Sequence, residues 1–458
     1  MVDSHDVIVA PASGAGQCAV AVVRLSGRGS SAIVAGMGAA ASADRCMRLC
    51  WLRHPATGRV LDQAMVVVYP DGSSYTGEEA AEIFCHGGPA VIDSIVSAAV
   101  DLGAVRAGPG DFTRRAVAAG RIDLVQAEAV ALLSSSTNES SIDIALHALA
   151  GHPSGELQVL SGRLLDYLAE CEASLDFDES DEIYVDLRGL SDELLSCVSL
   201  MDTWIRDARA VDTAVSGFKV VLSGAPNAGK STLMNALAGR DVAIVHDTPG
   251  TTRDVVSERV ILAGVPCILS DTAGIRPDAG EIEAEGVRRA IRAASQADLV
   301  LSVFDSTQPF NGLEPLSAGM PGIEPRAFRD HALVITKSDL PGSRSCQLAD
   351  TVDPVFVVSG LTGAGVSQLR DFIAARAVDS LRRAAGVSAV VAGDRQVATL
   401  TLARDRLAAG VGHLRDGAPQ EIVAACIRDA VGAIGGITGA AITEEVLDRI
   451  FSRFCIGK

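Results

Sequence analysis

Short apolar runs separated by glycine-containing turns fill the first 118 residues of the chain. Residues 6–10, 18–24 and 64–69 are rich in valine and alanine, which favours β-strands, whereas residues 89–104 have a helical pattern. We therefore expect an N-terminal α+β module with few helices.

Apolar positions change to helical spacing after this module. They recur every three or four residues over 124–149, 157–175 and 190–214, and this part of the chain has almost no proline. The same spacing returns over 394–454, where Thr443 is the expected N-cap of the last helix. Two separated stretches of the chain are thus predicted to be helical.

A third pattern lies between the two helical stretches. Apolar runs at 218–223, 331–335 and 354–358 predict core strands, and residues 260–270 predict a hairpin that ends in a core strand. Because helical sequence flanks this segment on both sides, we expect a domain inserted into a helical domain.

Together these patterns predict a multidomain α/β protein whose inserted domain has a mostly parallel sheet. The expected parts are an N-terminal α+β domain at 1–118, a helical domain at 119–215 and 379–458, and the inserted domain at 216–378.

Composition narrows the class of protein. Lys and Arg number 39 and Asp and Glu number 57, so the net charge of −18 opposes unaided binding to nucleic acid. The 10 cysteines include no C-x-x-C pair, so we expect reduced thiols rather than a zinc site or a disulfide framework. The acidic N-terminus has no signal-peptide pattern, and no apolar run reaches about 18 residues. We expect a cytoplasmic protein without a membrane segment.

Residues Gly224–Ser231 read GAPNAGKS and fit the phosphate-loop pattern G-x-x-x-x-G-K-[ST]. The loop follows a predicted strand and opens into a predicted helix at 232–238, as this motif requires. Its glycines let backbone N–H groups turn toward phosphate oxygens, and the helix N-terminus adds partial positive charge. We expect Lys230 to reach the β- and γ-phosphates and the Ser231 hydroxyl to ligate Mg²⁺.

Two downstream motifs suit the γ-phosphate and its metal. Residues 250–254 read GTTRD, and either Thr251 or Thr252 is expected to close on Mg²⁺ when the γ-phosphate is present. Residues 271–274 read DTAG, in which Asp271 is expected to hold a Mg²⁺-bound water and the Gly274 N–H to sense the γ-phosphate.

Two later motifs suit a guanine base. Residues 336–339 read TKSD, and the Asp339 carboxylate can accept two N–H bonds from a guanine edge, whereas adenine offers a different donor pattern. Residues 359–360 form a small-residue loop after the last strand and are expected to back the base. Five motifs in this order, each after a strand, predict a GTPase.

The chain resembles the tRNA-modification GTPases of the MnmE/TrmE type nearly from end to end. Part of the resemblance lies in the phosphate loop with its Asn227, in GTTRD and in DTAGIR at 271–276. Further motifs are SYTGE at 74–78, HGGP at 86–89, RIDLVQAEA at 121–129 and the terminal FCIGK at 454–458. The FCIGK ending is highly specific to that family.

This resemblance implies a function. The N-terminal domain is expected to dimerise and to bind 5-formyl-tetrahydrofolate, and the helical domain to carry the inserted GTPase domain. With an FAD-containing partner, as a heterotetramer, the family adds a carboxymethylaminomethyl or aminomethyl group to C5 of the wobble uridine, U34, of certain tRNAs.

The resemblance also implies the site residues. The GTP contacts would be Asn227, Ala228, Gly229, Lys230, Ser231, Thr232, His246, Asp247, Thr248, Pro249, Gly250, Thr251, Thr252, Asp271, Thr272, Ala273, Gly274, Thr336, Lys337, Ser338, Asp339, Ser359, Gly360 and Leu361. The Mg²⁺ ligands would be Ser231 and Thr252, and the K⁺ ligands Asn227, His246, Thr248 and Thr251. Hydrolysis is then expected to be stimulated by K⁺ when two GTPase domains face each other, with Arg253 and Arg276 as rival electrophiles. Glu283 would orient the attacking water, with Lys230 as the catalytic cation.

The implied folate contacts are Arg24, Glu82, Arg121 and Lys458. A carboxylate and cations suit a pterin ring and a glutamate tail, although solvated surface charge is the alternative for Glu82 and Arg121. Arg121 stands where the family often has Lys, which keeps the charge but changes the geometry.

Three further positions need separate interpretation. Thr336 stands where the family usually has Asn, and it lacks the amide donor that would reach the base. Ser359–Leu361 replaces the usual Ser-Ala-Lys. Cys455 is fourth from the end, but Gly457 and Lys458 fit a prenylation box poorly. Its thiol has either a chemical role near the modification site, by resemblance, or a packing role.

Two other functions remain open at the level of sequence. One is a GTPase of ribosome assembly or regulation, and the other is a nucleotide-gated scaffold with negligible hydrolysis. The folate-type residues and the FCIGK terminus favour tRNA modification.

Overall fold

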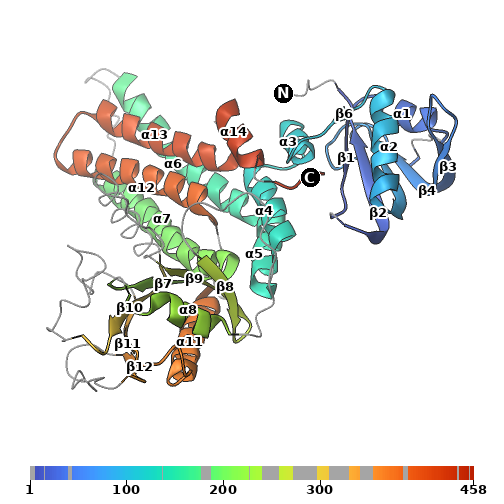
Figure 1. Cartoon of the computed structure of the whole chain (residues 1–458). Coiled ribbons are helices and arrows are strands. Elements are labelled where there is room, and N and C mark those ends of the chain that lie inside the picture. The colour runs from blue at the N-terminus through green and yellow to red at the C-terminus, as the bar shows by residue number, and fades with distance from the viewer. Residues whose placement is uncertain are drawn as a thin grey trace, which may run out of the picture. The chain divides into compact units, whose positions relative to one another are not determined.

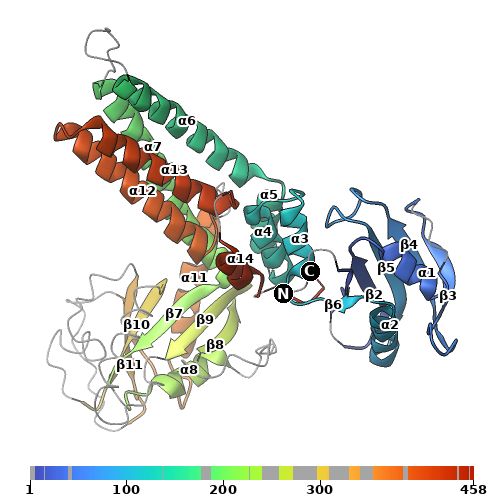
Figure 2. The same cartoon turned by 90° about the horizontal axis from the view of Figure 1, so that it is seen from above.

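The computed structural model describes most of the chain and divides it into two compact units (Figures 1 and 2). The described residues are 6–14, 16–39, 44–136, 138–176, 187–225, 227–239, 257–271, 297–308, 330–340, 354–384, 390–440, 443–452 and 454–457. The first unit comprises Met1–Ser135, Ala145–Asp202 and Asp394–Lys458, and the second comprises Ser136–Ile144 and Thr203–Gly393.

A six-stranded sheet in the order β3-β4-β5-β2-β1-β6 forms the N-terminal module. Its strands are β1 (Ile8–Pro11), β2 (Cys18–Ser26), β3 (Arg48–Arg53), β4 (Val60–Tyr69), β5 (Ala80–Gly87) and β6 (Val105–Arg106). Neighbouring strands are antiparallel except for the parallel pair β1–β6. The three predicted strands are present as β1, β2 and β4 with shifted ends, whereas β3, β5 and β6 go beyond the sequence prediction.

Helices cover one face of this sheet (Figure 1). They are α1 (Ser30–Gly36) and α2 (Pro89–Asp101), and they pack on the buried side chains of alternate strand positions such as Val23 and Ile83. Helix α2 ends before residue 104, the predicted end, because the chain leaves the helical region at Gly103, whose φ is +100°.

The opposite face, called the open face below, carries an apolar row across four strands. Leu49 pairs with Met65, Met65 with Phe84, and Phe84 with Val22. Leu49 is 63% exposed and Met65 42% exposed. A row of exposed apolar side chains on a sheet face is a candidate interaction surface.

The helical parts of the chain form eight helices among the described residues outside the two sheet modules. They are α3 (Asp111–Ala118), α4 (Leu124–Ser135), α5 (Glu139–Leu149), α6 (His152–Asp176), α7 (Leu187–Ser216), α12 (Asp394–Arg415), α13 (Gln420–Thr438) and α14 (Glu444–Phe451). Helix α13 packs against both α6 and α12, so segments far apart in the sequence lie side by side (Figures 1 and 2).

One helical prediction needs correction, and another is confirmed only in part. Residues 124–149 do not form one continuous helix, because α4 ends at Ser135 and α5 begins at Glu139. The Asn138 side chain accepts a hydrogen bond from the Ser141 N–H, in the first turn of α5, at 2.8 Å. Such a local bond competes with helix continuation. Thr443 occupies the N-cap position of α14 as predicted, but its side chain makes no capping hydrogen bond.

A second six-stranded sheet in the order β12-β11-β10-β7-β9-β8 forms the inserted domain. Its strands are β7 (Phe218–Ser223), β8 (Ser257–Leu262), β9 (Val265–Asp271), β10 (Leu299–Asp305), β11 (His331–Thr336) and β12 (Val355–Val357). Every neighbouring pair is parallel except the hairpin β8–β9, so the predicted mostly parallel sheet is confirmed.

Two helices of this domain, α8 (Lys230–Ala238) and α11 (Val366–Ala384), share an apolar core with the sheet. The carboxyl ends of β7, β9, β10 and β11 meet at one edge, which is where open α/β sheets bind ligands.

The described cysteines are all free thiols, including the exposed Cys455. None of the helices in the described ranges has the length and apolarity needed to cross a bilayer.

Candidate functional site

The predicted phosphate loop leaves the carboxyl end of β7 and leads into α8. Gly229, with φ +89°, is the N-cap of this helix, and the helix begins at Lys230. A Cβ at Gly224 would lie 2.2 Å from the carbonyl oxygen of Val303 on β10, so only glycine allows the loop to leave the sheet here. This strand–loop–helix geometry directs the start of a helix toward the site, as anion binding requires.

The buried side chain of Lys230 holds the first two residues of the loop by hydrogen bonds. Its ammonium group donates to the carbonyl oxygens of Gly224 and Ala225, both at 2.8 Å, and the residue is only 3% exposed. Burial lowers the pKa of Lys230, and the opposing charge of Asp271 offsets part of this effect. The arrangement keeps a cation at the centre of the loop.

Asn227 and Thr232 lie at the surface of the same loop and helix. Asn227 is exposed and adopts a φ of 62°, a left-handed conformation that asparagine tolerates better than most residues. Thr232 contacts the loop after β12, since a Cβ on Gly360 would lie 3.1 Å from Thr232 atoms. The structure therefore brings the first and last predicted nucleotide motifs together.

The oxygens of Ser231 and Asp271 meet at the ends of two adjacent parallel strands. The Ser231 hydroxyl donates to the Asp271 carboxylate at 3.1 Å, and Asp271 is 3% exposed. A hydroxyl beside a carboxylate fits a hard divalent cation such as Mg²⁺, which prefers oxygen ligands.

The predicted base-recognition segment follows β11. Asp339 is exposed, and Lys337, with φ 58°, forms an ion pair with Asp305 at 2.7 Å. Burial alone would raise the pKa of Asp305, but hydrogen bonds from Lys337 and Thr307 outweigh this effect and lower it. Asp305 is a residue that the sequence prediction missed, although its position as the last residue of the buried strand β10 marks this edge of the sheet.

Thr336 differs from the other residues of this segment because it is buried behind the phosphate loop. Its hydroxyl lies 2.6 Å from the carbonyl oxygen of Ala228 and 3.0 Å from that of Phe304. The Ser338 N–H donates to the Val358 carbonyl at 3.3 Å, which ties the segment to the loop after β12. In that loop Ser359 is fully buried, whereas Leu361 is 81% exposed.

Several predicted site residues lie outside the described residues. They are His246, Asp247, Thr248, Pro249, Gly250, Thr251, Thr252, Thr272, Ala273, Gly274, Glu283 and Lys458, together with the rival electrophiles Arg253 and Arg276.

A second candidate site is a cavity of about 150 Å³ in the N-terminal module. Arg24 and Glu82, which are directly paired on β2 and β5, form a salt bridge at 2.8 Å in its lining. The Tyr69 hydroxyl donates to the second Glu82 oxygen at 3.2 Å, and burial together with Glu82 raises the pKa of Tyr69. Two of the four predicted folate contacts are therefore adjacent.

Aromatic rings hold the Arg24 guanidinium in place. Its central carbon lies 5.7 Å from the centre of the Tyr75 ring and 5.8 Å from that of Phe112, within the range of cation–π attraction. Arg121 does not line this cavity in the described part of the chain, but its side chain packs against Gly77 and donates weakly to Gly72, on the loop that closes it.

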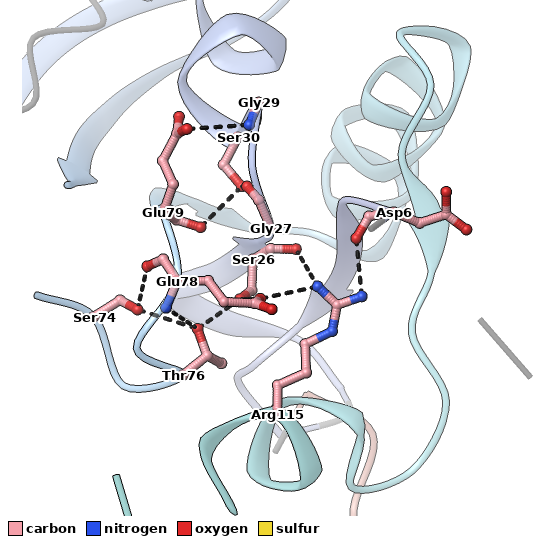
Figure 3. A network of polar contacts seen from close by, with 10 residues as sticks. All are labelled: Asp6, Ser26, Gly27, Gly29, Ser30, Ser74, Thr76, Glu78, Glu79 and Arg115. Atoms are coloured by element: carbon pink, nitrogen blue, oxygen red, sulfur yellow. Dashed lines mark hydrogen bonds and ion pairs between the residues drawn. The ribbon is translucent and has the colours of Figure 1, made fainter. Parts of the chain in front are cut away.

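Buried hydroxyl groups line the same cavity and belong to the network shown in Figure 3. Thr76 lies 2.6 Å from Ser26 and 3.1 Å from Ser74, hydroxyl to hydroxyl, and Ser26 donates to the Glu78 carboxylate at 2.9 Å (Figure 3). Arg115 holds Glu78 by a salt bridge at 2.9 Å. These bonds fix the loop of residues 74–78, whose sequence SYTGE was one of the predicted motifs.

The C-terminal tail reaches the N-terminal module within the first unit. Ile456 forms a β-bridge with Pro109, and a Cβ at Gly457 would lie 2.1 Å from the Pro11 carbonyl oxygen. The Gly457 carbonyl in turn lies 3.5 Å from the Arg24 guanidinium. The tail thus brings the exposed Cys455 into the neighbourhood of the cavity.

Comparisons with known proteins identify the family to which the chain is similar. The family profile of the GTP-binding protein TrmE N-terminus matches residues 7–121, and that of the MnmE helical domain matches residues 124–455. The chain is 41% identical to the tRNA modification GTPase MnmE of Methylobacterium radiotolerans and 37% identical to that of a strain of Thermus thermophilus, each over 99% of both chains. The solved G domain of the T. maritima FeoB iron transporter is 26% identical over 35% of this chain and 98% of its own, with a TM-score of 0.23.

Proposed function

Because the chain belongs to the MnmE family of tRNA modification GTPases, we propose that it couples GTP hydrolysis to the modification of U34, the wobble uridine, in certain tRNAs. Together with an FAD-containing partner, it adds a carboxymethylaminomethyl or aminomethyl group at C5 of that base. The observation that carries the proposal is the Arg24–Glu82 cavity in a chain that also has a phosphate loop. The folate-type residues and the FCIGK terminus favour this function over that of a GTPase of ribosome assembly.

Mass spectrometry of tRNA nucleosides tests this function. A strain that lacks the gene should lose the C5-modified wobble uridine, and the full-length chain should restore it. A Cys455→Ser chain, tested in the same strain, asks whether the exposed thiol has a chemical role. Unchanged nucleosides in the deletion strain would exclude the function and favour a GTPase that acts elsewhere.

For the hydrolytic step we assign roles to this chain's own groups. Lys230 supplies positive charge at the β- and γ-phosphates, and Ser231 with Thr252 would hold Mg²⁺, which would stabilise the charge that develops on the phosphates. Glu283 orients the attacking water. The geometry of Lys230 and Ser231 supports this scheme, and Thr252 and Glu283 enter it by family membership.

A second copy of this chain is the partner that we propose for the open face. Arg24 and Glu82 lie on that same face, two residues along β2 and β5 from the row formed by Val22 and Phe84. A homodimer that covers the apolar row would therefore also approach the cavity. This continuity supports a pocket that is completed on dimerisation.

Glu82 is proposed to bind the pterin ring of 5-formyl-tetrahydrofolate in the cavity. Its carboxylate, held by Arg24 and Tyr69, can accept hydrogen bonds from the ring N–H and amino groups. Glu82→Gln should weaken folate binding at least about tenfold in a calorimetric titration, because a charged acceptor is lost. Asp101→Asn is the matched control, since Asp101 pairs with His54 outside the cavity. Equal affinities of Glu82→Gln and wild type would contradict the assignment.

Hydrolysis is proposed to depend on K⁺. The exposed Asn227, in its left-handed conformation, offers a side-chain oxygen beside the phosphate loop, and His246, Thr248 and Thr251 complete the set by family membership. A borrowed arginine gives other GTPases about 10³–10⁵ in rate, and a cation in that place should give a sizeable part of it. Turnover should fall at least about tenfold when Na⁺ replaces K⁺ at equal ionic strength, measured by phosphate release. Equal rates in both salts would exclude the K⁺ site.

A further inference from the structure

We propose that Thr336 positions the phosphate loop and does not read the base, so that guanine N7 receives no hydrogen bond from this side chain and Asp339, at the N1 and 2-amino edge, is the side chain that selects the base. This inference rests on the GTP site of the proposed function and specifies how that site selects its nucleotide.

The geometry of the Thr336 hydroxyl leaves no hydrogen for the base. Thr336 is 2% exposed at the end of β11, and its oxygen lies 2.6 Å from the Ala228 carbonyl and 3.0 Å from the Phe304 carbonyl. A hydroxyl group has one hydrogen to donate, and both neighbours are acceptors. The single hydroxyl hydrogen of Thr336 is therefore used in a hydrogen bond to a backbone carbonyl of the protein.

The bond to Ala228 also sets the orientation of a peptide group. The Ala228 carbonyl and the Gly229 N–H belong to one trans peptide plane and point in opposite directions. When Thr336 holds the carbonyl toward β11, the Gly229 N–H points away from β11 at the N-terminus of α8, where phosphate oxygens bind. Lys230 donates to the Gly224 and Ala225 carbonyls in the same way. Lys230 and Thr336 together therefore fix the orientation of three carbonyl groups of the loop.

Guanine presents acceptors at N7 and O6 on one edge and donors at N1 and the 2-amino group on another. The exposed Asp339 carboxylate is an acceptor and suits the donor edge. For the acceptor edge, Thr336 offers no hydrogen, and the Lys337 ammonium is held at 2.7 Å by Asp305. Among the side chains of this segment, only Asp339 is thus free to read the base.

Binding of GDP analogues to the full-length wild-type chain tests the inference. In calorimetric titrations, 7-deaza-GDP should bind within about threefold of GDP, whereas IDP, which lacks the 2-amino group, should bind at least about tenfold more weakly. A loss of more than threefold for 7-deaza-GDP, or equal binding of IDP and GDP, would overturn the inference. If ADP binds as tightly as GDP, the GTP site itself is wrongly assigned, which is a distinguishable failure.

Substitutions at Thr336 separate its positioning role from base reading. Thr336→Val leaves the Ala228 and Phe304 carbonyls without their donor and should lower GDP affinity about tenfold, with an unchanged ratio of GDP to 7-deaza-GDP affinity. Thr336→Ser, which keeps the hydroxyl, should bind like wild type. Wild-type affinity in Thr336→Val would overturn the positioning role. If Thr336→Val does not fold, Thr336→Asn decides, because its amide donor should raise the ratio above threefold and an unchanged ratio would overturn the inference.

Discussion

Asp339→Asn should lower the affinity for GTP by about 10²–10⁴-fold and create affinity for xanthosine triphosphate. The carboxylate of Asp339 is expected to accept two hydrogen bonds from guanine, and each charge-assisted bond contributes about 1.5–3 kcal/mol. The asparagine amide can instead donate to the 2-oxo group of xanthine. Titrations of wild type and variant with both nucleotides measure the exchange.

The gain of affinity serves as the internal control for this prediction. If the variant loses affinity for GTP without gaining affinity for xanthosine triphosphate, the substitution has disturbed the structure of the base-binding loop and has not merely changed its base specificity. Wild-type hydrolysis of ATP at the rate of GTP would contradict the assignment of Asp339 to the base.

Lys230→Ala should reduce the rate of GTP hydrolysis by at least about 10²-fold. Loss of one preorganised group that stabilises transition-state charge usually costs about 10²–10³ in kcat. The variant also releases the Gly224 and Ala225 carbonyls that Lys230 holds, so nucleotide affinity should fall as well. Single-turnover hydrolysis and a nucleotide titration separate the two effects.

Lys219→Ala is the matched control for this substitution. Lys219 lies on β7, one strand length before the loop, and pairs with Asp212 at 2.7 Å. The substitution Lys219→Ala removes the same charge from the same domain without changing a contact of the phosphate loop. The GTP turnover of this variant should stay within about twofold of wild type. Equal losses in both variants would mean that Lys230 acts through overall charge or folding.

Much of the inserted domain could be predicted because its strands are continuous apolar runs, as parallel strands buried on both faces require. The runs at 218–223 and 331–335 became β7 and β11 almost unchanged. The N-terminal sheet was harder to predict. Strand β3 (RLCWLR) carries apolar residues on both its core face and its open face and arginines at its ends, so it does not alternate between apolar and polar residues.

The candidate site likewise has contacts that could be predicted from the sequence and contacts that could not. The proximity of Lys230 to the loop follows from motif spacing, since the residues are neighbours in sequence. The Thr336–Ala228 bond joins residues 108 positions apart, and the Lys337–Asp305 pair joins residues 32 apart. No local pattern encodes such contacts, because they arise only when the strands are placed side by side. The rings of Tyr75 and Phe112 around Arg24 have the same origin.

The open face also contains a spectroscopic reporter. The chain has 2 tryptophans, of which Trp204 is 7% exposed and Trp51, on β3 of the open face, is 55% exposed. Indole fluorescence shifts to shorter wavelength when the ring leaves water, so burial of Trp51 by another molecule changes the emission while Trp204 adds a constant background. A dilution series can therefore follow coverage of the open face with no attached dye, and Trp204→Phe would remove the background.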